Sequence, residues 1–363
     1  MKILYVITSL RTGGAEKLVV ELTSAMREMG HIADVALFDG YHTPLKEELQ
    51  KTGCRIYDLH INDTDYPPVK SFYSPRRLFQ LSRVMKGYDV VHTHNTAPQL
   101  FAAIAKFFGR KAKLVTTEHN TTNARRDKSW LLPFDRWMYN RYRKVICISD
   151  QAHDNLVSYI KHTKAEILTI KNGVNLKTLH EASPIEGFKK DPSRFTVLMV
   201  SAFRAQKDHK TLLQAMSLLG DGYELFLAGD GELRGQMENF CKELGLEERV
   251  HFLGNRSDVP SLLKSADAVV MSSHYEGLSL SSIEGMAVDK PFVASDVDGL
   301  HEIVEGAGIL VEHQNPQALA DALRRLKEDP AYCRSVAESC RKRASEYDFS
   351  KMAAAYNSVY ESL

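Results

Sequence analysis

Short apolar runs alternate with longer amphipathic segments from one end of the chain to the other. Each run is three to five residues long and mostly continuous, which is typical of parallel strands that are covered on both faces. The runs of the first half are residues 3–7, 33–37, 55–59, 90–93, 114–117, 145–148 and 167–170. Those of the second half are residues 196–200, 224–228, 250–252, 268–271, 291–294 and 309–311.

Segments with helical periodicity separate these runs. The most regular are residues 15–29, 76–85, 98–108, 151–159, 209–219, 233–244, 316–327 and 349–362. This alternation, repeated twice, predicts an α/β fold of two Rossmann-like domains, each a doubly wound parallel sheet. We expect an N-terminal domain at residues 1–175, a polar linker at 176–194, a C-terminal domain at 195–348 and a last helix at 349–363.

Composition narrows the class of protein. The chain has 363 residues, of which 44% are hydrophobic and 26% charged, and its net charge of +1 gives no general attraction to nucleic acid. The first apolar run is too short for a secretory signal, and no run approaches the ~18 apolar residues of a membrane span. The five cysteines show no CxxC spacing, so we expect reduced thiols and a cytoplasmic protein.

The segment HYEGLSLSSIEGMA at residues 274–287 is the strongest candidate for chemistry. Glu276 and Glu284 flank a turn of small residues that follows the buried run 268–271 and leads into a predicted helix. Backbone amides at a helix start bind anions, and flanking carboxylates accept hydrogen bonds from hydroxyl groups. The pattern favours a ligand in which a sugar is joined to a phosphate. The alternative is two surface glutamates, the first of them near a helix N-terminus.

Three further groups follow predicted strands, at the edge where parallel sheets bind ligands. Gly13 and Gly14 could leave amides free for an anion, or form a plain turn. Arg204 and Lys207 suit a diphosphate, unless they are solvated surface cations. His119 could bond a sugar hydroxyl or be a structural histidine. We predict no metal at His92 and His94, because no third ligand stands at a recognisable spacing. We also assign none to two acidic triplets: Asp63-Thr64-Asp65 lies in a polar loop before two prolines, and Asp296-Val297-Asp298 follows a strand and borders Gly299.

Basic and aromatic residues are concentrated in residues 99–144. This segment holds eleven Lys or Arg and three acidic residues, together with both tryptophans and six Phe or Tyr residues. The combination suits contact with an anionic membrane surface, or a solvated basic face over an ordinary core.

Together these motifs resemble a retaining glycosyltransferase of family 4 with the GT-B fold, and the resemblance covers nearly the whole chain. It rests on GGAE (13–16), DVVHTHN (89–95), TEH (117–119), KNGVN (171–175), QKD (206–208), LAGDGELR (227–234), VHFLGNRSDVP (250–260) and EGLSLSSIE (276–284). The pair of glutamates separated by seven residues is the most specific element. One departure is that Ala202 stands where the family commonly has a phosphate-binding Arg, which leaves the role of Arg204 open.

The resemblance implies roles for individual residues. Glu276 would contact the donor sugar and Glu284 the nucleotide ribose, while Arg204 and Lys207 would stabilise the diphosphate. His119 would lie near the sugar, and Gly14 near the phosphate and the acceptor. The diphosphate would meet the amides of Gly277, Leu278, Ser279 and Leu280. The residues along the base would be Leu253, Gly254, Asn255 and Arg256. The last helix would cross back onto the N-terminal domain.

The activity implied is a hexosyltransferase that moves a hexose or N-acetylhexosamine from a nucleotide-diphosphate sugar to a glycan or lipid-linked acceptor. The reaction would need no metal and no cofactor, a UDP-sugar would be favoured over a GDP-sugar, and the enzyme could contact the inner face of the membrane through residues 99–144. A nucleotide-sugar epimerase or hydrolase and a non-catalytic sugar-nucleotide-binding scaffold stay open as alternatives.

Overall fold

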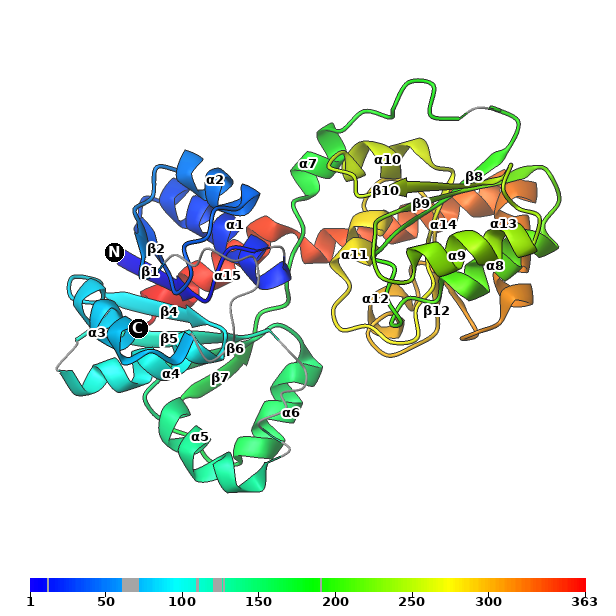
Figure 1. Cartoon of the computed structure of the whole chain (residues 1–363). Helices are drawn as coiled ribbons and strands as arrows, with labels where there is room; N and C mark the ends of the chain where they lie inside the picture. Colours follow the sequence, from blue (N-terminus) through cyan, green and yellow to red (C-terminus); the bar gives the residue numbers. More distant parts are fainter. Residues whose placement is uncertain (12, 61–71, 109–110, 120–125, 127, 190) are drawn as a thin grey trace. The chain divides into compact units, whose positions relative to one another are not determined.

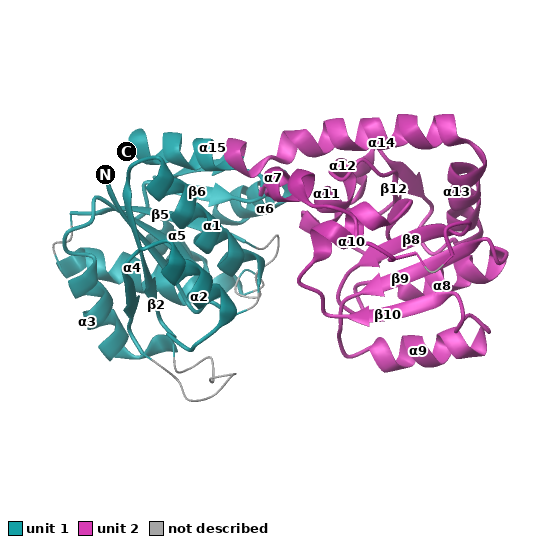
Figure 2. Ribbon diagram, turned by 90° about the horizontal axis from the view of Figure 1, so that it is seen from above, with its two compact units in different colours: residues 1–171, 352–363 teal, residues 172–351 magenta. Residues whose placement is uncertain are grey.

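The computed structural model describes every residue except 12, 61–71, 109–110, 120–125, 127 and 190. The chain forms two compact α/β units (Figures 1 and 2). Unit 1 contains residues 1–171 and 352–363, and unit 2 contains residues 172–351. The segment expected to be a linker, 176–194, therefore lies within unit 2, where helix α7 (Leu176–Glu181) begins directly after the boundary.

Unit 1 is built on a seven-stranded parallel sheet with the order β3-β2-β1-β4-β5-β6-β7. Its strands are β1 (Lys2–Ile7), β2 (Ile32–Leu37), β3 (Ile56–Asp58), β4 (Val90–His94), β5 (Lys113–Glu118), β6 (Lys144–Cys147) and β7 (Glu166–Thr169). The central strands are buried along nearly their whole length, so both faces of the sheet are covered. This explains why their sequences are continuously apolar and do not alternate.

The helices of unit 1 connect successive strands, as parallel pairing requires. They are α1 (Gly14–Glu28), α2 (Pro44–Lys51), α3 (Pro75–Val84), α4 (Thr96–Ala105), α5 (Leu132–Tyr139) and α6 (Asp150–Ile160). Local sequence fixes several starts: the side chain of Thr43 caps α2 and that of Ser149 caps α6, each by accepting a backbone N–H of the first turn.

The last helix, α15 (Phe349–Glu361), packs against unit 1. Its tyrosines reach the sheet: the Tyr360 hydroxyl lies 2.6 Å from Nδ1 of His92, and the Tyr356 hydroxyl lies 3.3 Å from Oγ1 of Thr117. Tyr360 also donates to the hydroxyl of Tyr5 at 3.2 Å. Buried hydroxyls need partners, so these contacts fix the register of the helix on strands β1, β4 and β5.

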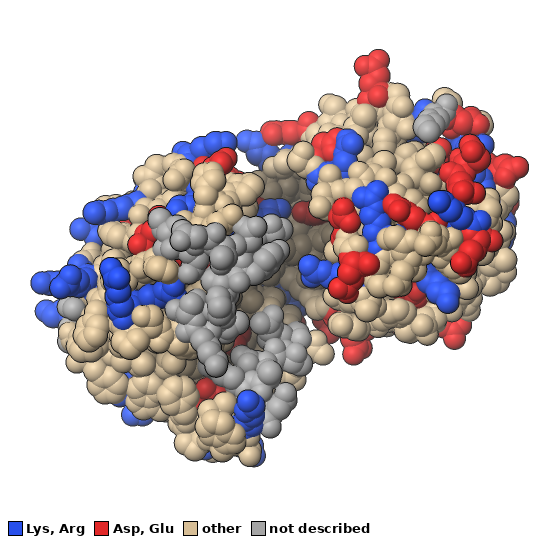
Figure 3. Space-filling model, in the orientation of Figure 1, with Lys and Arg blue, Asp and Glu red and all other residues tan. Residues whose placement is uncertain are grey.

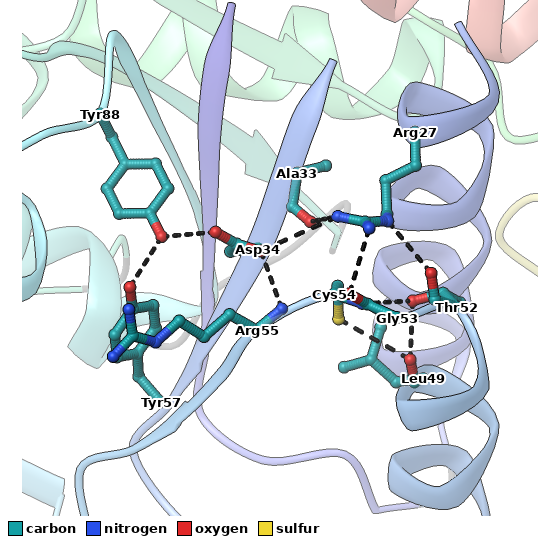
Figure 4. Close-up of polar contacts among 10 residues, drawn as sticks. All are labelled: Arg27, Ala33, Asp34, Leu49, Thr52, Gly53, Cys54, Arg55, Tyr57 and Tyr88. Carbon is teal, nitrogen blue, oxygen red and sulfur yellow. Dashed lines mark hydrogen bonds and ion pairs between the residues drawn. The ribbon is translucent and has the colours of Figure 1, made fainter. Parts of the chain in front are cut away.

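A polar cluster in the first half of β2 ties this part of unit 1 together (Figure 4). The carboxylate of Asp34 accepts from the backbone N–H of Arg55 at 2.8 Å and from the Tyr88 hydroxyl at 2.7 Å. Arg27 of α1 lies 4.0 Å from the same carboxylate and donates to the carbonyl oxygens of Thr52 and Gly53. The cluster thus joins α1, β2 and the segment that leads into β3.

Unit 2 has a six-stranded parallel sheet with the order β10-β9-β8-β11-β12-β13. Its strands are β8 (Phe195–Val200), β9 (Tyr223–Ala228), β10 (Val250–Gly254), β11 (Ala268–Met271), β12 (Phe292–Ser295) and β13 (Ile309–Val311). The helices after α7 are α8 (His209–Leu218), α9 (Arg234–Glu243), α10 (Val259–Ser265), α11 (Leu280–Met286), α12 (His301–Val304), α13 (Pro316–Glu328) and α14 (Pro330–Ala344).

Both sheets have a topological switch point, and these points position the candidate site. Strand order reverses between β1 and β4 in unit 1 and between β8 and β11 in unit 2. Ligands of open parallel sheets bind beyond the carboxyl ends of the strands at such reversals. All thirteen predicted strands are present, and the prediction of two doubly wound parallel sheets is confirmed.

Candidate active site

The switch point of unit 2 brings together a lysine and a glutamate from two loops. Lys207 follows β8 and Glu276 follows β11, and Nζ of Lys207 forms an ion pair with Oε1 of Glu276. Their side chains are only 13% and 7% exposed. Removing one partner of so deeply buried an ion pair strongly destabilises the folded protein, because the other charge then stays buried without compensation.

Two further side chains orient the Glu276 carboxylate. Oγ of Ser273 donates to Oε1 at 2.6 Å, and Nε2 of Gln206 donates to Oε2 at 3.1 Å. Gln206 also donates to the carbonyl of Tyr275 at 2.9 Å, so it holds both the backbone and the side chain of this loop. The carboxylate is thus placed by residues from the loops after β8 and β11 before any ligand binds.

The loop after β12 packs against the backbone of the segment that carries Glu276. The backbone N–H of Glu276 donates to the carbonyl of Asp298 at 3.2 Å. Gly299 has a φ of +81°, and a Cβ atom there would lie 2.3 Å from the carbonyl oxygen of Gly277 and 2.4 Å from that of Glu276. Only glycine combines this backbone conformation with so close an approach.

Arg204 behaves differently from Lys207. Its side chain is exposed and makes no hydrogen bond or ion pair with any residue that the structure describes. The loop that carries it is tightly packed, because a Cβ at Gly229 would lie 2.0 Å from the carbonyl oxygen of Ser201, and the N–H of Phe203 donates to the carbonyl of Asp230 at 3.1 Å. The backbone around Arg204 is therefore fixed, while its guanidinium is available to a ligand.

The segment between the two glutamates leads directly into α11. Gly277 is exposed, Leu278 and Leu280 pack partly against the core, and Ser279 is the N-cap residue. Ser282 donates to Oγ of Ser279 at 2.7 Å. Glu284 is half-buried in α11, as the predicted helix start near Ser279 requires.

The residues predicted along the nucleotide base lie at the edge strand of unit 2. Leu253 is in β10, and Asn255 and Arg256 follow it on the exposed rim. Arg256 is held by Asp258 through two hydrogen bonds of 2.8 and 2.5 Å, and this pairing raises its pKa. The carbonyl of Gly254 accepts from the N–H of Gly229 at 2.8 Å, which links this rim to the loop that packs under Arg204.

In unit 1, His119 is joined to a second histidine. Nε2 of His119 lies 2.8 Å from Nδ1 of His94, which ends β4. Burial lowers the pKa of His119 to about 4 and that of His94 further below its usual value. Both rings are therefore neutral at pH 7, and one nitrogen donates its proton to the other.

Glu118, next to His119, anchors the end of β5. Its carboxylate accepts from Gln99 at 3.1 Å and Tyr139 at 2.7 Å, and it forms an ion pair with Arg126 at 3.1 Å. Arg126 is 10% exposed, so it is not one of the solvated cations expected for the basic and aromatic segment 99–144. Arg110 and Arg125 of that segment lie outside the described residues.

The remaining predicted positions are placed as follows. Gly14 is the exposed first residue of α1, and no atom lies within 4 Å of a Cβ built there. Asp296 pairs with His301, whereas the triplet at residues 63–65 lies outside the described part of the chain. Both ring nitrogens of His92 lie within hydrogen-bond distance of hydroxyls, those of Tyr360 and Thr117.

Sequence reasoning missed Gln206, Ser273 and Gly299, all of which hold Glu276 in place. Gln206 is the first residue of the QKD motif and Ser273 directly precedes the segment 274–287, so both could have been found from these motifs. Gly299 could not, because its role depends on the loop after β12 approaching a segment some twenty residues earlier in the chain.

Comparison with known proteins is consistent across the chain. Residues 12–178 match the model of Glycosyltransferase Family 4, and residues 183–345 match that of Glycosyl transferases group 1. The two models together span nearly all of both units.

Two bacterial transferases are among the similar sequences. The chain is 26% identical over 350 residues to a UDP-Gal:alpha-D-GlcNAc-diphosphoundecaprenol alpha-1,3-galactosyltransferase of Escherichia coli, covering 85% of this chain and 89% of the relative. It is 24% identical over 360 residues to a Campylobacter jejuni N-acetylgalactosaminyltransferase whose substrate is a diphospho-undecaprenol-linked sugar, with 96% of each chain covered.

Solved structures show the same fold. The Anabaena protein HepE in complex with UDP superposes with a TM-score of 0.84 at 24% identity, covering 100% of both chains. Its complex with UDP-glucose gives a TM-score of 0.79 at 23% identity, again over 100% of both chains. The expected GT-B fold is confirmed.

Proposed function

The chain belongs to the group 1 and family 4 glycosyltransferases, and on this basis we propose that it is a retaining hexosyltransferase. Its donor is a nucleotide-diphosphate sugar carrying a hexose or N-acetylhexosamine, and its acceptor is a hydroxyl of a glycan or lipid-linked sugar. The observation that carries the proposal is the buried pairing of Lys207 with Glu276 at the switch point of unit 2. It places a cation and a carboxylate where a sugar diphosphate would meet the sheet.

A UDP-sugar is the donor class we favour. HepE has been solved with UDP and with UDP-glucose, and the E. coli relative is named for UDP-galactose. In this arrangement Glu276 bonds the sugar hydroxyls and Glu284 the ribose. Arg204, Lys207 and the amides of residues 277–280 bind the diphosphate, and Leu253, Asn255 and Arg256 lie along the base.

The reaction proceeds through loss of the diphosphate before the new bond is complete. The bond between the sugar C1 and the phosphate oxygen breaks, and the diphosphate leaves with the electron pair. Lys207 and Arg204 stabilise the negative charge that develops on it. The acceptor hydroxyl oxygen bonds to C1 from the same face, and its proton passes to a phosphate oxygen. The two cations supply the charge stabilisation, so the transfer step requires no metal ion.

For His119 and Gly14, which lie in unit 1, we propose the roles that the family resemblance implies. With a pKa lowered to about 4, His119 is neutral at pH 7 and acts as a hydrogen-bonding group toward the sugar. Its Nε2 is engaged by His94, so we assign the contact with the sugar to its other ring nitrogen, Nδ1. Gly14, open on its Cβ side, allows phosphate or acceptor to approach the start of α1 closely.

A lipid-linked acceptor is supported by exposed aromatic side chains in unit 1. Trp130 is 73% exposed and Phe107 61%, and Phe107 and Phe134 both stack on Trp137. Arg141 lies over the rings of Phe107 and Trp137. On the face drawn in Figure 3 most charged side chains of unit 1 are Lys or Arg, whereas unit 2 carries both signs. Aromatic rings beside cations suit the headgroup region of an anionic membrane.

No helix in the described part of the chain is both long and apolar enough to cross a bilayer. The proposal concerns contact with the membrane surface, through the described aromatic residues of segment 99–144.

A donor screen tests the function. Thermal unfolding is measured with UDP, GDP, ADP and their common sugars, on the wild type and on Glu284→Ala. A nucleotide at ~100 times its Kd adds ~2.7 kcal/mol of stability. We expect a shift with UDP compounds that is reduced in Glu284→Ala, where each shift is measured against the same protein without ligand.

A turnover assay that measures UDP release, together with the same thermal screen, distinguishes the alternatives. Release of UDP from a UDP-sugar at full rate without any acceptor would favour a hydrolase or epimerase. No shift with any nucleotide would contradict the proposal and favour a scaffold.

A further inference from the structure

Three metal-ligating side chains meet beside the donor loop of unit 2. Asp208 follows β8, His274 follows β11 and His313 follows β13, so all three lie at the carboxyl edge of the sheet. Nδ1 of His274 is 2.8 Å from Nε2 of His313 and 4.0 Å from Oδ2 of Asp208. One ligand atom from each residue lies within 4.8 Å of the other two. We propose that this cluster binds a divalent transition-metal ion of the Zn²⁺ type.

The ligand set selects the class of ion. Two imidazoles and one carboxylate suit Zn²⁺, Co²⁺ and Ni²⁺, whereas Mg²⁺ and Ca²⁺ prefer sites made entirely of oxygen ligands. Ligand atoms about 2.1 Å from a tetrahedral ion lie roughly 3.4 Å apart. The observed separations of 2.8 and 4.0 Å lie on either side of that value, so small side-chain rotations would complete the site. A water molecule would occupy the fourth position.

The surroundings of the cluster favour metal binding. Asp208 is buried and its carboxylate is already oriented, because it accepts from the N–H of Thr211 at 3.1 Å and from the Thr211 hydroxyl at 2.6 Å. Such second contacts hold a ligating carboxylate in place, and each oxygen keeps a further lone pair for the ion. The His274 side chain is 32% exposed, which gives an ion a path of entry from solvent.

Ordinary structural roles, without a metal ion, explain only part of this arrangement. Asp208 is the N-cap of α8, and this accounts for its contacts with Thr211. A shared proton accounts for the contact between the two histidines. Neither explains why the capping carboxylate and both imidazoles converge from three separate loops.

An ion at this site would act on the structure and not on the transfer step. Asp208 directly follows Lys207 in the chain, and His274 precedes Glu276 by two residues. A bound ion would tie the loops after β8, β11 and β13 to one another and thereby stabilise the segment that carries Glu276. The inference does not depend on the identity of the donor sugar.

The test uses the full chain without a histidine tag, stripped of metal by a chelator that is then removed. Co²⁺ is titrated and its visible absorption recorded, and thermal unfolding is measured with and without Zn²⁺. We expect saturable binding of one Co²⁺ per chain with a tetrahedral spectrum, and a higher unfolding temperature with Zn²⁺. His313→Ala should weaken Co²⁺ binding by at least about tenfold.

His301→Ala is the matched control. His301 is another histidine of unit 2 with two carboxylate neighbours, Asp296 and Glu305, but it lies outside the cluster. The His301→Ala variant should bind Co²⁺ as the wild type does. Circular dichroism verifies that each variant is folded, and His313→Gln replaces His313→Ala if the latter is not. No saturable Co²⁺ band in the wild type, or an unchanged band in the folded His313 variant, would overturn the inference.

Discussion

Lys207 and Glu276 are 69 positions apart in the chain, yet they form a buried ion pair between two adjacent strand ends. The pair neutralises Lys207 while no ligand is bound. A diphosphate would compete with Glu276 for this ammonium, and Glu276 would then be released toward the sugar hydroxyls. Donor binding would therefore replace the Glu276 carboxylate with the diphosphate as the partner of Lys207. The ammonium of Lys207 would have an anionic partner both before and after the donor binds.

The first prediction separates stability from catalysis at this pair. Glu276→Ala should lower the free energy of unfolding by about 3 kcal/mol, because Lys207 is left buried without a counter-charge. The double variant Lys207→Met/Glu276→Leu should recover most of that stability while showing no transfer activity. Urea unfolding and UDP release measure the two effects. Activity in the stable double variant would contradict the assigned roles.

Removing the Arg204 side chain should affect catalysis and leave stability nearly unchanged, unlike the loss of Glu276. The Arg204 side chain is exposed and makes no hydrogen bond or ion pair with any described residue, so Arg204→Ala should change the free energy of unfolding by less than about 0.5 kcal/mol. If Arg204 binds the diphosphate, the same variant should lower kcat/KM for the donor by roughly tenfold or more, the loss of a charged hydrogen bond. Lys210→Ala removes a nearby exposed cation of α8 and serves as control. Equal activity in both variants would leave Lys207 as the only diphosphate cation among these candidates.

Gly299 should affect donor binding, although we do not expect Gly299 to contact the donor. In Gly299→Ala the new Cβ would collide with the carbonyl oxygens of Glu276 and Gly277 and displace the donor loop. Gly306→Ala is the control, since Gly306 also has a positive φ, +72°, but no atom lies within 4 Å of its Cβ position. Gly306→Ala should lose about 1 kcal/mol of stability from backbone strain alone, and Gly299→Ala should lose more because the collision adds to that strain. Only Gly299→Ala should raise the donor KM, and equal KM values would show that the contact is irrelevant to binding.

The membrane proposal is tested by sedimentation with lipid vesicles. Trp130→Ala and Phe107→Ala remove exposed rings and should reduce binding to vesicles rich in anionic lipid, with little effect on stability. Leu218→Ala removes an apolar side chain of unit 2 that is 46% exposed and should leave binding unchanged. Salt should weaken the wild-type interaction, because its electrostatic part is screened. Binding that is the same in all three variants would rule out the aromatic surface as the contact.

The fold could be predicted from sequence because its signals are local. Thirteen short apolar runs, many of them followed by an amphipathic segment, leave little choice other than parallel sheets covered by helices. Strand order was not accessible, because the side-chain pattern of a fully buried strand does not identify its neighbours. Helix α14 was not anticipated: its only buried side chains are Val336, Cys340 and Ala344, too few for a clear stripe. The Asp329-Pro330 pair that starts it was nevertheless a readable cap signal.

The candidate site was accessible only in part. Lys207, Glu276 and Glu284 lie in recognisable motifs, and their residue types suit the chemistry. The ion pair between Lys207 and Glu276 could not be foreseen, because it requires that β8 and β11 be neighbours. The same limit applies to Asp208, His274 and His313, which the sequence scatters over more than a hundred positions. Segment 99–144 was interpreted from composition, and composition cannot show that Arg126 is buried against Glu118.

The buried histidines of unit 1 predict how stability depends on pH. Burial lowers the pKa of His92 to about 3 and that of His119 to about 4, from an unfolded value near 6.5. The unfolded chain therefore binds these protons at a higher pH than the folded chain does. Stability is complete above pH 6.5 and falls progressively as the pH drops toward 4, because protonation then favours unfolding. Thermal unfolding followed by circular dichroism between pH 4 and 8 should show this decline, with a smaller slope in His92→Gln, which cannot titrate. A slope that is equal in the variant and the wild type would mean that other groups, not His92, cause the acid sensitivity.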